Sequence, residues 1–94
     1  MNKRDLLALG KPIITSEKGN SMTPLVKSGQ KHELTPCTID DVDVGDIVHA
    51  KVHGRWFTHL VTAKNDQKGA QISNNHGHVN GWTKNVVAKL TKVL

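Results

Sequence analysis

The stretch VGDIVHAKVHGRWFTHLVTAK, residues 44–64, carries the strongest structural signal in the chain. Two runs rich in β-branched and aromatic residues, 47–52 and 56–64, flank the triplet His53-Gly54-Arg55. Two such runs around a short loop that contains glycine predict a β-hairpin. The Gly45-Asp46 pair just before them predicts a turn at the start of the first strand.

Further short strands are expected on both sides of this hairpin. β-branched residues predict a first strand over 12–18, and a second strand over 31–38 is expected to lie at a sheet edge or to be interrupted by Pro36. A second hairpin is predicted over 70–82, and the closing segment 85–94 alternates in a way that favours a strand over an amphipathic helix. Roughly five to seven short strands with a turn about every 8–12 residues indicate a mainly β fold, either a small folded sheet or a partly open barrel.

Length and composition limit the class of protein. The 94 residues are expected to form one domain over residues 1–94 with a single modest core. No apolar run approaches the ~20 residues that cross a bilayer, and the apolar stretch near the N-terminus is too short for a secretory signal. The single cysteine, Cys37, excludes an intramolecular disulfide and fits a reducing compartment. These features predict a soluble cytoplasmic protein without a membrane anchor, and they leave its oligomeric state open.

The formal net charge of +5 makes nucleic acid a partner to consider. The lysines are scattered along the chain, and one Phe and two Trp offer few rings for stacking on bases. A solvated basic surface is therefore favoured. A basic β-barrel that binds nucleic acid remains as one alternative.

A serine in a turn-forming context is the most distinctive feature outside the first hairpin. The sequence Gly-Asn-Ser-Met-Thr-Pro at 19–24 contains Ser21. It is followed by Gly-Asp-Ile-Val at 45–48, by His59 within Thr-His-Leu-Val, and by the stretch ISNNHGHVNGW at 72–82. Segments far apart in the sequence can still contribute to one site, because the members of a catalytic site need not be adjacent in sequence.

In this order the four segments resemble the type I signal peptidase family and its relatives, the self-cleaving SOS-type repressor domains. The resemblance spans about residues 12–94 and implies that Ser21 is a nucleophile and His59 its general base. It places Met22 beside a substrate groove and Pro24 in the turn that presents the serine. Within these 94 residues we expect neither the membrane anchor of the signal peptidases nor the DNA-binding domain of the repressors. A stripped core of this kind fits a phage or prophage genome.

The sequence departs from the family pattern where the family carries aspartates that orient the base. Ser73 and Asn80 stand near those positions, and we expect one of them to contact the second ring nitrogen of His59. An asparagine can orient an imidazole, but it supplies no charge to stabilise the protonated ring. The resemblance assigns Asp46 to a motif that is largely structural, so we expect it to stabilise a turn.

The chemistry of a Ser–His dyad is consistent with these residue types. A serine hydroxyl is a weak nucleophile near neutral pH and needs an adjacent base, and an imidazole can take its proton there. The predicted function is a soluble serine endopeptidase that hydrolyses an extended peptide through Ser21 and His59 without a cofactor. One alternative is a catalytically decayed module that binds peptides. Taken alone, Ser21 could instead cap a helical turn, and His59 could be a half-buried strand histidine.

The remaining histidines raise a metal site as a competing hypothesis. His49 and His53 would share one face of a regular strand, and His76 and His78 form a His-x-His pair at a turn. No Cys or His spacing matches a standard zinc motif, so exposed loop histidines are favoured and no metal is expected.

Overall fold

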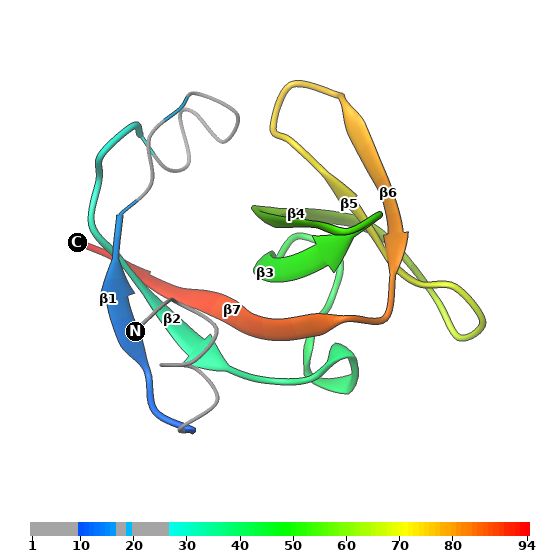
Figure 1. Cartoon of the computed structure of the whole chain (residues 1–94), viewed down its shortest axis with the longest axis horizontal. Helices are drawn as coiled ribbons and strands as arrows, with labels where there is room; N and C mark the ends of the chain where they lie inside the picture. The colour runs from blue at the N-terminus through cyan, green and yellow to red at the C-terminus, as the bar shows by residue number, and fades with distance from the viewer. Residues whose placement is uncertain (1–9, 17–18, 20–26) are drawn as a thin grey trace.

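The computed structural model describes residues 10–16, 19 and 27–94. Within them seven strands form one antiparallel sheet, in the order β1-β2-β7-β3-β4-β5-β6 (Figure 1). This arrangement confirms the expectation of a mainly β fold. The elements are β1 (Ile13–Thr15), β2 (His32–Pro36), the 3₁₀ helix η1 (Ile39–Asp41), β3 (Ile47–Val52), β4 (Arg55–Asn65), β5 (Gly69–Ser73), β6 (Val79–Thr83) and β7 (Val86–Val93).

The predicted central hairpin is present as β3 and β4. Its register runs from Ile47 opposite Leu60 to Val52 opposite Arg55, so only two residues form the loop. Both have left-handed backbones, His53 with φ 49° and Gly54 with φ 80°, as a type I′ turn requires. The expected three-residue loop is therefore one residue too long.

The second hairpin and the closing strand are also confirmed, as β5–β6 and β7. Of the two expectations for the second strand, the edge position is wrong, because β2 pairs with β1 on one side and with β7 on the other. The interruption by Pro36 is confirmed, because the strand ends at that residue. Pro36 is tolerated as its last residue. β1 pairs only with residues 32–34, so Pro36 lies where β2 has a single partner strand.

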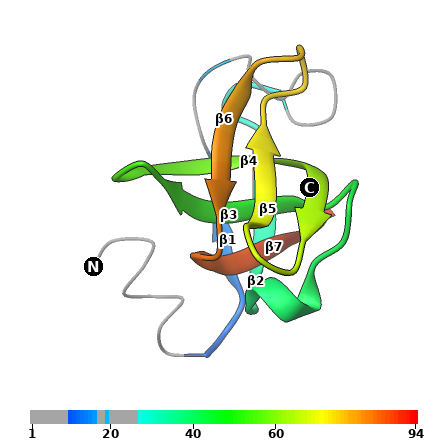
Figure 2. The same cartoon turned by 90° about the vertical axis from the view of Figure 1, so that its right-hand side faces the viewer.

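The sheet curls until its β6 end approaches β3 (Figure 2). The hydroxyl of Thr83 donates to the carbonyl oxygen of Lys51 at 2.6 Å, and the Lys51 N–H donates to the Asn85 carbonyl oxygen at 3.0 Å. This curvature encloses the main core, and β3 in its centre is buried on both faces. The core comprises Val42, Val48, Ala50, Val52, Val61, Ala70, Ile72 and Val86.

The part of the chain that the structure describes contains no helix with the length and hydropathy needed to cross a membrane.

Candidate active site

His59 occupies a position in β4 that faces the core. It pairs with Val48 and alternates with Phe57 and Val61, so the four side chains share one face of the sheet. Val48 and Val61 belong to the main core, and Phe57 packs against it. The Phe57 and His59 rings lie 5.0 Å apart between centroids. A half-buried imidazole among apolar side chains loses hydrogen bonds to water, so it needs a hydrogen-bond partner within the protein.

Asn80 in β6 is such a partner. The Nδ1–H group of His59 donates to Asn80 Oδ1 at 2.6 Å. An amide oxygen can only accept, so the neutral ring must carry its proton on Nδ1 and its lone pair on Nε2. The expected contact between the imidazole and a side chain from 73–80 is therefore present, and the tautomer it selects is the one a general base acting through Nε2 requires.

Ser73 and Asp46, the other two expected supporting residues in the described part of the chain, make contacts that stabilise the fold. Ser73 is 3% exposed, and its Oγ lies 2.9 Å from Thr62 Oγ1. The Asp46 carboxylate accepts the Asp43 N–H at 2.9 Å, and its own N–H donates to the Asp43 carbonyl oxygen at 3.0 Å. These two bonds close the turn before β3, which confirms that Asp46 stabilises a turn.

Ser21, Met22 and Pro24 lie outside the described residues. The predicted separation between Ser21 and His59 therefore stays a prediction.

The connection between β5 and β6 depends on Asn74, which the sequence reasoning did not single out. Its Oδ1 accepts the backbone N–H groups of His76 and His78 at 2.8 and 2.9 Å, and its own N–H donates to the His78 carbonyl oxygen. An Asn that folds the chain back on itself in this way is a common turn device, and the Asn-Asn-His-Gly run was the available signal. Asn74 thus fixes the hairpin that carries Asn80. Phe57 was also missed, although its alternation with His59 could have indicated it.

The expected geometry of the other histidines is partly wrong. His49 is a buried strand residue, 5% exposed, whose Nδ1 lies 3.0 Å from Thr58 Oγ1 and whose ring stacks on Trp56. His53 lies in the tight turn beyond β3, so the pair does not share a face of one strand. Because the loop has only two residues, His53 lies in the turn, and the alternation of side chains along β3 does not extend to it. Among residues 10–16, 19 and 27–94, no three His, Cys, Asp or Glu side chains gather where they could hold a metal ion.

Cys37 is the competing nucleophile to consider, and its surroundings work against that role. Burial raises the pKa of the half-buried Cys37 thiol, and the nearby negative charge of Asp41 raises it further. A reactive cysteine needs the opposite shift, because the thiolate is the nucleophilic form.

We therefore expect iodoacetamide at pH 8 to alkylate Cys37 roughly tenfold or more slowly in the folded protein than in urea. Mass spectrometry of timed samples measures both rates. Equal rates would show that the thiol is neither buried nor deactivated.

The chain matches no protein-family model, and no curated protein matches it significantly.

Proposed function

We propose that this chain is a serine endopeptidase in which Ser21 is the nucleophile, His59 the general base and Asn80 the residue that orients the base. The observation that supports the proposal is the 2.6 Å contact between His59 Nδ1 and Asn80 Oδ1. It links two residues that the order of sequence motifs had already singled out. It also leaves the lone pair of the neutral imidazole on Nε2, the atom that would accept the serine proton.

The proposed reaction is amide hydrolysis through an acyl-enzyme. Ser21 Oγ attacks the peptide carbonyl carbon while its proton passes to Nε2 of His59. The protonated ring then gives this proton to the leaving nitrogen, the C–N bond breaks, and an ester remains on Ser21. Water repeats the sequence, which releases the carboxylic acid and restores the serine hydroxyl.

The proposed site has an uncharged asparagine, Asn80, beside the base where a site with an aspartate would have a negative charge. Its amide oxygen can hold the ring in the required tautomer, but it carries no negative charge to stabilise the imidazolium that forms. We therefore propose a slow peptidase. Its substrate would bind as an extended strand along an edge strand of the sheet, where backbone hydrogen bonds supply affinity.

The direct test is labelling of the folded protein with a fluorophosphonate, which reacts with activated serines. Mass spectrometry should find one label, on Ser21, and none on Ser73 or Ser28. Ser73 is buried, and the Ser28 hydroxyl lies in a loop, where it accepts the Gly19 N–H. Labelling should require the unprotonated ring of His59, because a protonated ring cannot accept the serine proton.

Absence of labelling between about pH 6 and pH 9 in a folded sample would rule out the peptidase. Of the two alternatives, a β-barrel that binds nucleic acid and a module that binds peptides, the second would then be tested first. Its affinity for extended peptides would be measured by calorimetry.

A further inference from the structure

We infer that Gly81 is a positioning residue: its lack of a side chain lets β6 pack against the β3–β4 turn closely enough for Asn80 to reach His59. The functional meaning of this inference rests on the proposed peptidase. The geometric part does not, because the contact between the two side chains can be measured without catalysis.

The contact between His59 and Asn80 is unusual for its place in the sheet. β4 and β6 are not neighbours, since β5 lies between them. Neighbouring strands are about 4.8 Å apart, so two strands separated by a third lie about 10 Å apart in a flat sheet. Side chains that stand perpendicular to such a sheet would not meet. Something must bend β6 toward β4 and redirect the Asn80 side chain.

A β-bulge at Asn80 provides the redirection. Ile72 of β5 pairs with Gly81, and the next residue, Ser73, pairs with Val79. Asn80 is therefore the extra residue, without a pairing partner on β5. Bulges of this kind bend the strand, increase its twist and re-aim a side chain.

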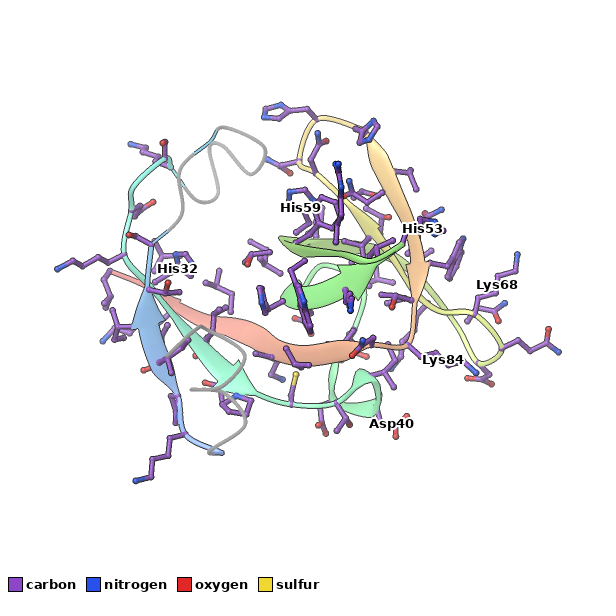
Figure 3. The ribbon with its side chains drawn as sticks, in the orientation of Figure 1. His32, Asp40, His53, His59, Lys68 and Lys84 are labelled. Carbon is purple, nitrogen blue, oxygen red and sulfur yellow. The ribbon has the colours of Figure 1, made fainter. Side chains whose placement is uncertain are left out.

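Gly81 provides the close approach. A Cβ atom built on Gly81 would lie 2.8 Å from His53 Nε2 and 3.0 Å from Val52 Cγ1. The backbone of β6 thus packs directly on the end of β3 and on the turn residue, and Figure 3 shows His53 at this end of the hairpin beside β6. Gly81 also has φ 141°, a conformation that L side chains rarely adopt. The exposed His53 ring can turn aside, but a side chain at Gly81 still meets the strain of this φ and the contact with buried Val52. We expect relief of both to displace β6 and the adjacent Asn80.

Thr83 holds the same strand against β3 two residues further on. Its hydroxyl donates to the Lys51 carbonyl oxygen at 2.6 Å. The competing explanation is that the hairpin turn built by Asn74 alone places Asn80. In that case the packing at Gly81 would be incidental.

The experiment compares Gly81→Ala with wild type by long-range ¹H–¹⁵N NMR of the histidine rings. Wild-type His59 should show a protonated Nδ1 and an unprotonated Nε2. Gly81→Ala should abolish this preference and produce a mixture of tautomers. Fluorophosphonate labelling of Ser21 should fall by about 10²-fold, the usual effect of a displacement near 1 Å in a catalytic group.

Two control variants separate close packing from backbone strain. Gly45→Ala also places a side chain at a positive φ, 100°, but nothing lies within 4 Å of the added atom, so His59 should keep its tautomer. His53→Gly removes the ring that faces Gly81 and suits a turn position with positive φ. The double variant His53→Gly/Gly81→Ala should therefore regain part of the wild-type tautomer signal.

A wild-type tautomer pattern in folded Gly81→Ala would overturn the inference and favour the hairpin turn as the positioning device. If Gly81→Ala does not fold, Thr83→Val takes its place, because it removes the hydroxyl that holds β6 to β3. An unchanged His59 spectrum in that variant would equally overturn it. Failure of wild type to label with the probe contradicts the proposed peptidase alone, since the NMR result does not depend on catalysis.

Discussion

His59→Ala is expected to lower the rate of Ser21 labelling by a fluorophosphonate roughly 10²–10⁴-fold, the range over which a general base typically contributes. The physical reason is that no other group is proposed to accept the serine proton. Pseudo-first-order labelling rates, followed by intact-protein mass spectrometry, measure the effect. The fold should survive, because the half-buried ring lies between core residues and does not form the centre of the core.

The matched control is His78→Ala. His78 is exposed in the β5–β6 connection, where its backbone N–H and carbonyl groups bond to Asn74. Labelling should be unchanged in this variant. A similar loss of labelling in both histidine variants would mean that the effect comes from the hairpin and that His59 is not the base.

Asn80 allows a variant with a gain of function. Asn80→Asp keeps an acceptor oxygen opposite Nδ1 and adds the negative charge that stabilises an imidazolium, so it should label faster than wild type. Asn80→Ala should label more slowly, because the ring loses its orienting bond. The reverse order of rates would contradict an orienting role for residue 80.

The second large effect is expected for stability. Ile72→Ala should lower the free energy of unfolding by about 2–5 kcal/mol, because it opens a cavity in a core from which water is excluded. Ile72 is 0% exposed in β5 and belongs to the main core. Such a loss is a large share of the roughly 5–15 kcal/mol that stabilises most domains.

Ile14→Ala makes the same chemical change at a site in β1 where the side chain is 53% exposed. It should alter the free energy of unfolding by no more than about 0.5 kcal/mol. Urea unfolding followed by tryptophan fluorescence compares the two variants. Equal losses would show that the core does not lie where the structure places it.

The sequence by itself determined the local elements. The alternation in β3 and β4 and the glycine between them identify the central hairpin, because a pleated strand places successive side chains on opposite faces and a tight turn needs a left-handed residue. The same reasoning found the β5–β6 hairpin and the strand nature of β7. Each of these features depends on residues that are close together in the chain. The sequence motifs also singled out His59, with Ser73 and Asn80 as two candidate partners.

The tertiary structure alone decided the relations between distant segments. Local pattern could not place β2 between β1 and β7, since pairing partners are chosen by packing over the whole sheet. Nor could it show that Asn80 is the partner of His59 while Ser73 lies against Thr62. That choice depends on a single extra residue in β6, which changes the direction of a side chain, and on a glycine that allows two strand segments to touch. Both effects arise from contacts between residues far apart in sequence, and a local pattern of residue types carries no record of such contacts.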